Sequence, residues 1–425
     1  MNKKIDKRII NNASWIVVGR VFQLILTFIT TMLVTRYLGP EKYGIISYSY
    51  SYVVLFLPLC TLGMNDIATK EFIENKTESG KMLGTIFVLR FVSSTLSIIF
   101  IYLIVSILNN NPMVSYIALL QSLSLVFQIF DTIVYFYQSQ LLAKKTGIIY
   151  IVAYSLTTVY RIIGLITKRN IEWFALAVSF DFLVVSILLL IVYFSEGNKL
   201  SFSFEFAKEL LSKSKHYILS GILIVIYGKV ADTLLLGKMV DETTVGYYSA
   251  ATTLCNAWPF VLTAIIDTSS PIIIDTYAND KNEYKKKMKE LYSTIFYIGV
   301  IVAIIITIFS KQIVSILYGV DYLPATTPLK IVCWNTIFAY IGVSRYIWIQ
   351  CEEKTKYETL ITLFGAITSV VLNYILISNY GIIGASIALT LTQFLTNFVF
   401  LFIMKDTREN AKLILEAILL KDVFK

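Results

Sequence analysis

Residues 15–34 read WIVVGRVFQLILTFITTMLV, an apolar run interrupted by one charged side chain, Arg20. An α-helix needs about 20 mostly apolar residues to cross a bilayer, so this run predicts a membrane-spanning helix. The whole chain of 425 residues is 56% hydrophobic and only 15% charged, whereas a soluble domain carries about 25% charged residues. We therefore expect an all-α polytopic membrane protein.

Apolar runs of spanning length continue along the chain in two groups of six, separated by a polar stretch at 195–215. The first group lies at 15–34, 44–63, 82–108, 114–137, 147–166 and 171–194, and the second at 216–237, 246–277, 291–309, 328–350, 357–377 and 381–404. Twelve spans place both termini on the same side of the membrane. The connections are short and leave no room for a soluble catalytic domain, which argues against an enzyme.

The basic residues indicate which side holds the termini. Most of the 37 Lys and Arg residues fall in the N-terminus, the even-numbered connections and the tail at 405–425, and this asymmetry predicts cytoplasmic termini. Because these residues flank spans, the net charge of +9 does not point to nucleic acid. The four cysteines lack metal-ligand spacing, so we expect no metal and no cofactor.

Five basic residues lie within the predicted spans. Arg161 shortens the fifth span, and the other four are the candidates for function. Each costs roughly 2.5–3.5 kcal/mol on insertion scales unless it faces a bundle interior or a watery cavity. They are Arg20, Arg90, Lys229 and Arg345. Their spread over both halves suggests an interior that holds an anionic group, and the alternative is structural pairing with nearby carboxylates.

Uncharged polar side chains accompany two of these arginines. They are Gln23, Thr27 and Thr31, which share one helical face with Arg20, and Ser94, which lies one turn after Arg90. We expect the first stripe to face a cavity. Thr and Gln also hydrogen-bond between packed helices, so helix packing remains the other interpretation.

Carboxylates inside the spans nearly match the cations in number. They are Asp131, Asp181, Asp232 and Asp267. Lys229 and Asp232 are spaced i, i+3 and close enough to pair, either as a structural ion pair or as a switch that opens for an anion or a proton. Asp267 lies between two prolines of one span and is the best candidate for coupling to an ion gradient, with structural pairing as its alternative.

The two halves share a short motif at matching hairpins. The first span ends in Arg36-Tyr-Leu-Gly39-Pro-Glu-Lys-Tyr43-Gly44, and the seventh ends in Leu236-Gly237 followed by Val245-Gly246. We expect Gly39, Gly44, Gly237 and Gly246 to form outside turns, where positive φ favours glycine. The repeat predicts lobes at 1–194 and 216–404, a linker at 195–215 and a cytoplasmic amphipathic tail at 405–425.

These motifs carry a resemblance to a known family. Asn12-x-x-Trp15, Arg20 and Arg36-Tyr-Leu-Gly39-Pro-x-x-Tyr43-Gly44, together with Asp232-x-x-Leu-Leu-Gly237, resemble bacterial polysaccharide repeat-unit flippases of the Wzx type. These proteins belong to the multidrug/oligosaccharidyl-lipid/polysaccharide superfamily. The resemblance implies a MATE-like fold of two six-helix lobes in the bacterial plasma membrane.

The same resemblance implies a cargo and partners. Undecaprenyl-pyrophosphate-linked oligosaccharides, of O-antigen or capsule, would cross from the cytoplasmic to the outer leaflet, with H⁺ or Na⁺ coupling. Arg20, Arg90 and Arg345 would bind the pyrophosphate directly, because a guanidinium can bind phosphate bidentately. Lys229 would contribute positive electrostatic potential as a field-setting charge. Membrane lipids contact the helices, and a polysaccharide polymerase and a chain-length regulator are further candidate partners.

The same residues bear on other classes of transporter and on membrane enzymes. A MATE-type exporter of organic cations favours acidic sites, which four basic residues at depth oppose. A lipid-linked peptidoglycan-precursor flippase stays open, although such proteins usually carry more than twelve helices. A membrane polymerase or glycosyltransferase would need a large outer loop or metal-binding loops, and neither is present.

Overall fold

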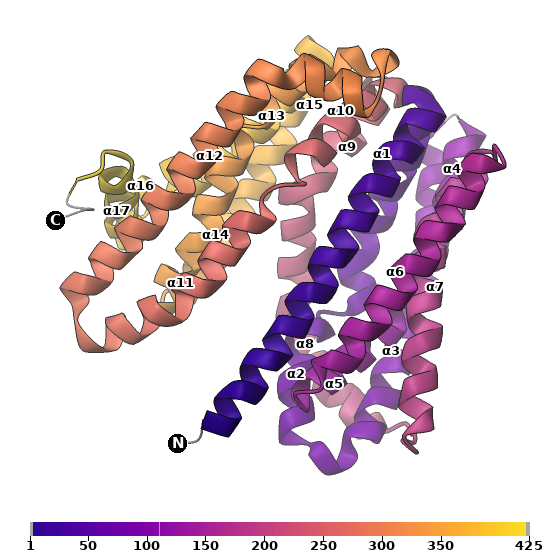
Figure 1. Ribbon diagram of the computed structural model, residues 1–425, viewed down its shortest axis with the longest axis vertical. Helices are drawn as coiled ribbons and strands as arrows, with labels where there is room; N and C mark the ends of the chain where they lie inside the picture. The colour runs from indigo at the N-terminus through magenta and orange to yellow at the C-terminus, as the bar shows by residue number, and fades with distance from the viewer. Residues whose placement is uncertain (1–2, 110, 422–425) are drawn as a thin grey trace. The chain divides into compact units, whose positions relative to one another are not determined.

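The computed structural model describes residues 3–109 and 111–421, and within these ranges it contains helices and no strand (Figure 1). The predicted all-α membrane fold is confirmed. The chain divides into two compact units that meet between Val225 and Ile226. This boundary lies inside the seventh predicted span, at a π-helical turn, and not in the linker at 195–215.

The first unit consists of eight α-helices and two 3₁₀ turns among the described residues. Their bounds are α1 Lys3–Thr61, α2 Met64–Glu74, η1 Lys76–Glu78, α3 Ser79–Leu108, α4 Pro112–Phe127, η2 Gln128–Asp131, α5 Thr132–Ser139, α6 Ala143–Ile166, α7 Ile171–Ser195 and α8 Phe204–Val225. Helix α1 packs along α6, α4 and α3, and α7 packs along α4 and α6. Met82, Tyr137 and Tyr193 are almost fully buried in the core of this unit.

The second unit begins with a π-helical turn, and a second π-helical turn follows its long helix α15. Its elements are η3 Ile226–Val230, α9 Ala231–Met239, α10 Glu242–Cys255, α11 Phe260–Asn279, α12 Lys281–Leu317, η4 Val320–Ala325, α13 Thr326–Val332, α14 Asn335–Cys351, α15 Thr355–Phe394, η5 Leu395–Val399, α16 Phe400–Ile403, η6 Lys405–Thr407 and α17 Arg408–Ile418. Helix α15 packs against α9, α13 and α14.

Seven helices in the described residues are long and apolar enough to span a membrane, and nine are if two bent helix pairs each count as one span. Two of the seven, α1 and α15, hold two predicted spans each. Non-helical backbone at Gly39 separates the two spans in α1, and non-helical backbone at Gly381 separates those in α15. The predicted tenth span is interrupted between α13 and α14. The protein is therefore a multi-pass membrane protein, and the count of twelve stays a prediction.

Of the four glycines expected at outside turns, Gly39 has a positive φ of 74°. Gly44, Gly237 and Gly246 lie in helical backbone within α1, α9 and α10. The positive φ expected at these three positions is therefore absent, and the outside location of the turns stays a prediction. In the second unit the turn comes later, where the Asp241 side chain caps α10 by accepting a hydrogen bond from the Thr244 N–H at 2.7 Å. A side-chain cap thus replaces the positive φ of glycine.

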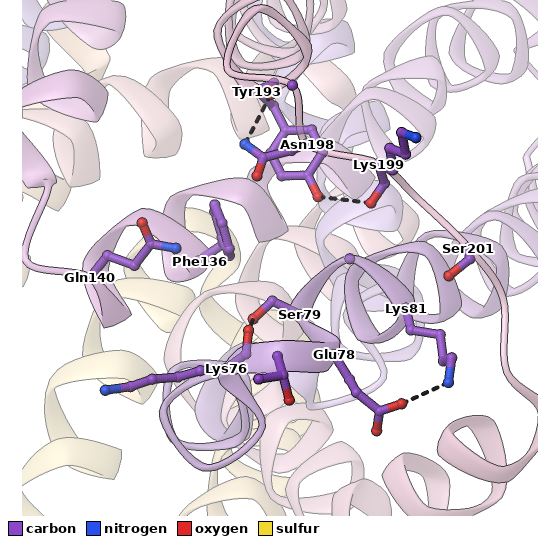
Figure 2. A pocket seen from close by; sticks show the side chains of 13 residues that line it. Lys76, Glu78, Ser79, Lys81, Phe136, Gln140, Tyr193, Asn198, Lys199 and Ser201 are labelled. Atoms are coloured by element: carbon purple, nitrogen blue, oxygen red, sulfur yellow. Dashed lines mark hydrogen bonds and ion pairs between the residues drawn. The ribbon is translucent and has the colours of Figure 1, made fainter.

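The first part of the predicted linker, residues 196–203 between α7 and α8, lies against the first unit as an extended strap (Figure 2), whereas residues 204–215 belong to α8. The strap crosses the start of α3, where a Cβ on Gly80 would come within 2.2 Å of the Lys199 carbonyl oxygen and one on Gly84 within 2.3 Å of that of Ser201. The Ser203 N–H donates to Thr85 Oγ1 at 3.0 Å. Two glycines on one face of α3 therefore let the linker backbone approach closely.

The C-terminal helix α17 packs on protein along its apolar side. Leu413 and Ile414 are buried, and α17 contacts α12. Two hydroxyls of α12 fix its end, with Ser293 Oγ donating to the Ala417 carbonyl at 2.7 Å and Tyr297 donating to that of Ile418 at 2.8 Å. The amphipathic pattern of the tail thus reflects docking against the second unit.

Candidate functional site

Arg90 is held inside the first unit by uncharged groups. Its side chain is 2% exposed and donates to Thr132 Oγ1 at 2.7 Å, to the Gln128 carbonyl at 3.0 Å and to Asn65 Oδ1 at 3.3 Å. The 3₁₀ turn η2 interrupts the fourth span here, which frees a backbone carbonyl that the guanidinium satisfies. Asp131 of the same turn interacts electrostatically with Arg90.

A second buried arginine, Arg161, joins three helices of this unit. It forms an ion pair with Asp181 of α7 and donates to Thr30 Oγ1 of α1 at 3.2 Å. Sequence reasoning placed Asp181 among the candidates but missed Arg161 as its partner. The signal was present, since Arg161 lies in a predicted span, but the pairing depends on how α6 and α7 pack.

The polar residues that follow Arg20 on the first span face the interior of the first unit. Gln23 Nε2 donates to the Tyr154 hydroxyl of α6 at 2.6 Å, and Thr31 lines a cavity inside the unit. Thr27 Oγ1 is a buried atom without a described hydrogen-bond partner. Both interpretations of the stripe therefore apply, helix packing at Gln23 and cavity lining at Thr31.

Arg20 differs from the other arginines in its surroundings. Its side chain is exposed on the surface of the first unit, and it makes no ion pair among the described side chains. The Tyr150 hydroxyl of α6 lies within electrostatic range of its guanidinium. Ser94, in contrast, is fully buried and donates to the Leu125 carbonyl at 3.2 Å, which is a packing contact between α3 and α4.

In the second unit Arg345 is the centre of a buried polar network. It is 2% exposed, donates to Asn397 Oδ1 at 2.9 Å and forms an ion pair with Glu358 at 3.2 Å. Asn397 in turn donates to the Tyr227 hydroxyl at 2.8 Å and to Gln393 Oε1 at 2.7 Å. The network thus links α14 and α15 to both π-helical turns.

Two glycines make room for this network. A Cβ on Gly342 would lie 2.4 Å from Asn397 Oδ1, and one on Gly365 would lie 2.7 Å from the Tyr227 ring. π-Helical turns are rare and often mark functional positions. Because η3 and η5 meet at these glycines, the network is a candidate functional position of the second unit.

The remaining candidates have different environments. Asp232 is buried and accepts a hydrogen bond from the Tyr248 hydroxyl of α10. The predicted Lys229–Asp232 pair falls on a lysine side chain outside the described part of the structure. Asp267 is exposed on α11 and makes no ion pair with the described residues.

The first unit contains two cavities of different character. One, of about 250 Å³, lies among α1, α4, α6 and α7. The other, of about 610 Å³, lies beside the linker, where Figure 2 shows Lys76, Lys81 and Lys199 around it and Lys81 paired with Glu78. Within residues 3–109 and 111–421 no cluster of His, Cys, Asp and Glu has a metal-binding arrangement.

Each of the two helical units buries an arginine that forms an ion pair within apolar helices of spanning length, as expected of a polytopic membrane protein. A family model described as polysaccharide biosynthesis protein matches residues 9–277, and the chain belongs to this family. A model described as MatE matches residues 217–375. The suspected kinship with polysaccharide flippases is thereby confirmed.

Curated relatives agree with this assignment over almost the whole chain. The putative O-antigen transporter of Escherichia coli K12 is 22% identical over 93% of this chain and 97% of its own. The capsular polysaccharide biosynthesis protein CapF of Staphylococcus aureus is 21% identical over 93% of this chain and 99% of its own. One relative is named a transporter and the other a polysaccharide biosynthesis protein, which agrees with the family match of this chain.

Solved structures show the same fold. The lipid II flippase MurJ in an inward closed conformation matches with a TM-score of 0.74 at 14% identity, covering 95% of this chain and 89% of its own. An inward-facing multidrug resistance transporter of the MATE family matches with a TM-score of 0.72 at 13% identity, covering 94% and 99%.

Proposed function

We propose that this protein translocates undecaprenyl-pyrophosphate-linked oligosaccharide repeat units from the cytoplasmic to the outer leaflet of the plasma membrane. The lobes at 1–194 and 216–404 would alternate access, with both termini in the cytoplasm. The names of the curated relatives, an O-antigen transporter and a capsular polysaccharide protein, support the substrate class. A polymerase and a chain-length regulator would act on the delivered repeat units.

Arg20 is the single observation that carries the proposal. A guanidinium in a membrane span is costly unless it meets water or an anion, and Arg20 is exposed without a described ion pair. The pyrophosphate of the cargo supplies the missing anion, which Arg20 can bind bidentately. Arg90 and Arg345 have partners within their own units, so they contribute positive potential and hold their helices in place, with Lys229 as a further field-setting charge.

Coupling to H⁺ or Na⁺ is assigned to the carboxylates. Asp267 is exposed on α11 without a described cation partner, so of the four carboxylates it is the one best placed to meet a coupling ion. Asp181 and Asp232 are already engaged by Arg161 and Tyr248, and Asp131 lies near Arg90. These three carboxylates therefore serve helix packing within their own units.

Deletion of the gene tests the function in the cell. We expect lipid-linked repeat units to accumulate in the inner leaflet and surface polysaccharide to disappear, with both restored by the wild-type gene. Normal surface polysaccharide in the deletion strain would contradict the proposal. Accumulation of a peptidoglycan precursor instead would favour the second candidate function, for which the fold of MurJ is the supporting observation.

A further inference from the structure

The cavity of about 610 Å³ beside the strap lies at the ends of two helices of spanning length (Figure 2). Its lining comes from residues 76–81, at η1 and the start of α3, and from Tyr193 and residues 197–201, at the end of α7 and in the strap. The apolar segments of spanning length run over Lys76–Leu108 and Ile171–Ser195. The cavity therefore lies where both helices pass from hydrocarbon to water, which is the level of the lipid headgroups.

The rim of this cavity is positively charged. Lys81 is paired with Glu78 at 2.6 Å. Lys76 and Lys199 are exposed on other edges of the cavity and make no ion pair with the described residues. Their ammonium groups are thus accessible and lack a carboxylate partner, which favours an anionic ligand.

The strap holds Lys199 beside the start of α3. The Ser201 N–H donates to the Gly80 carbonyl at 3.3 Å. Glu196, at the start of the strap, already has a partner in Lys145 of α6, so the carboxylate nearest in sequence is engaged elsewhere. A ligand that contacted both uncompensated lysines would join the strap to η1, two segments far apart in the chain.

Uncharged polar groups and two aromatic rings complete the lining. Thr77, Gln140 and Ser201 are exposed, and their side chains make no hydrogen bond within the described residues, so their O–H and N–H groups can donate to phosphate oxygens. Phe136 and Tyr193 are 4% and 1% exposed and form a buried floor. The volume falls within the roughly 300–1,000 Å³ of small-molecule sites, which leaves room for a phosphate with its glycerol.

Large apolar side chains lie next to the cavity in the sequence. Phe194 follows the lining residue Tyr193 and is 50% exposed, and Phe202 follows the lining residue Ser201 and is 49% exposed. Phe204, at the start of α8, is 79% exposed. Exposed apolar groups that gather in this way mark interaction surfaces for membranes or proteins. At the end of a spanning helix they suit acyl chains, which a free phosphate does not have.

We propose that this cavity binds the phosphate of an anionic membrane lipid, with Lys76 and Lys199 as its charged ligands and the acyl chains beside Phe194 and Phe202. Basic pockets at the cytoplasmic ends of membrane helices are suited to anionic headgroups, and in the proposed topology this end of the first unit is cytoplasmic. The site goes beyond the proposed transport function and does not depend on it. A bound lipid would hold the strap against η1 and α3.

Binding is measured by native mass spectrometry of the full-length protein in detergent, with phosphatidylglycerol and phosphatidylcholine as probes. We expect the wild type to bind phosphatidylglycerol more tightly. Lys76→Gln/Lys199→Gln should weaken that binding about thirtyfold, because each lysine near an anionic surface contributes about 1 kcal/mol and about 1.4 kcal/mol is a tenfold change. Binding of phosphatidylcholine, which carries no net charge, should stay the same.

Matched variants separate the site from net charge and from folding. Lys208→Gln/Lys215→Gln removes two exposed lysines of α8 that make no ion pair with the described residues, and it should bind phosphatidylglycerol like the wild type. Lys76→Arg/Lys199→Arg keeps both charges and should also bind like the wild type. Equal losses of affinity in the two glutamine variants, or a loss in the arginine variant while its melting temperature is unchanged, would overturn the site.

Amide hydrogen exchange locates the ligand and identifies its source. In phosphatidylcholine nanodiscs, inclusion of phosphatidylglycerol should slow exchange at residues 197–203 of the wild type and not of Lys76→Gln/Lys199→Gln. Unchanged exchange in the wild type would overturn the proposal. Equal slowing by inorganic phosphate would show a site for a soluble anion, and slowing by polyglutamate without an effect of phosphatidylglycerol would show a surface for an acidic protein segment. Either result would overturn the lipid assignment.

Discussion

At the scale of single residues, the basic side chains predicted to lie at membrane depth differ in their exposure and in their hydrogen-bond partners. Arg90 and Arg345 are 2% exposed and hydrogen-bonded within their own units, whereas Arg20 is exposed. Sequence alone could identify the charges at membrane depth because their cost is a local property. It could not assign their partners, because the groups that bind Arg90 lie on three other elements, Asn65 on α2, Gln128 in η2 and Thr132 at the start of α5.

Substitution of Arg20 separates charge from fold. We expect Arg20→Ala to abolish surface polysaccharide while membrane abundance stays near that of the wild type, because no described ion pair is lost. Arg20→Lys keeps the charge but loses the bidentate geometry, so partial export should persist. Measuring polymer export beside membrane abundance checks both, and normal export by Arg20→Ala would rule out pyrophosphate binding at this position.

The Arg161–Asp181 pair should behave as a structural unit. Removing one partner of a buried ion pair typically costs about 3–5 kcal/mol, whereas replacing both with apolar residues is often neutral. We therefore expect Asp181→Leu alone to lower the melting temperature in detergent strongly and Arg161→Met/Asp181→Leu to recover much of the loss. Additive effects of the two substitutions would show that the residues are not coupled.

At the scale of helices and linkers, the apolar runs predicted most spans, since a length of about 20 apolar residues is written directly in the sequence. The interruptions were not predicted. In the 3₁₀ turn η2 the Gln128 carbonyl accepts a hydrogen bond from Arg90 of α3, and the π-helical turns η3 and η5 meet through the side chains of Tyr227 and Asn397. Such contacts join distant segments and do not appear in the hydropathy of one run. Gly237 lacks the expected positive φ, and in the same region Asp241 supplies a side-chain cap.

The linker should depend on the small residues of α3. A Cβ at position 84 would come within 2.3 Å of the Ser201 carbonyl oxygen, so Gly84→Ala should displace the strap. We expect faster amide hydrogen exchange at residues 201–203, which a mass-spectrometric measurement can detect. Gly228→Ala, where a Cβ meets no atom within 4 Å, serves as control, and unchanged exchange in Gly84→Ala would contradict close docking.

The tail helix should undock in acid. Hydrogen bonding to Lys285 lowers the pKa of the Glu409 carboxyl, and hydrogen bonding from Tyr357 lowers that of Asp406. Groups with lowered pKa stabilise the folded form above their ordinary pKa, and this contribution is lost as pH falls through the lowered values. We expect exchange protection of α17 to be constant from about pH 5 to 8 and to fall below about pH 4. Glu409→Gln should remove part of this pH dependence, and a loss of protection near neutral pH would contradict the assignment.

At the scale of the whole molecule, α8 packs against α1, α2 and α3, so the first unit extends to Val225. The lobes at 1–194 and 216–404, which follow from the repeat and the polar stretch between two groups of runs, stay a prediction. A close approach explains the packing of α8, since a Cβ on Gly63 would lie 2.6 Å from that of Tyr217. Such contacts between distant segments are invisible to hydropathy.

Reconstitution tests the central claim most directly. The purified protein is placed in proteoliposomes with an undecaprenyl-pyrophosphate-linked oligosaccharide, and the fraction of oligosaccharide accessible to an external glycosidase is followed over time. Translocation by the wild type that increases with an imposed ion gradient and is lost in Arg20→Ala is the result that we predict. Accessibility in wild-type vesicles no greater than in protein-free vesicles, with or without a gradient, would contradict it.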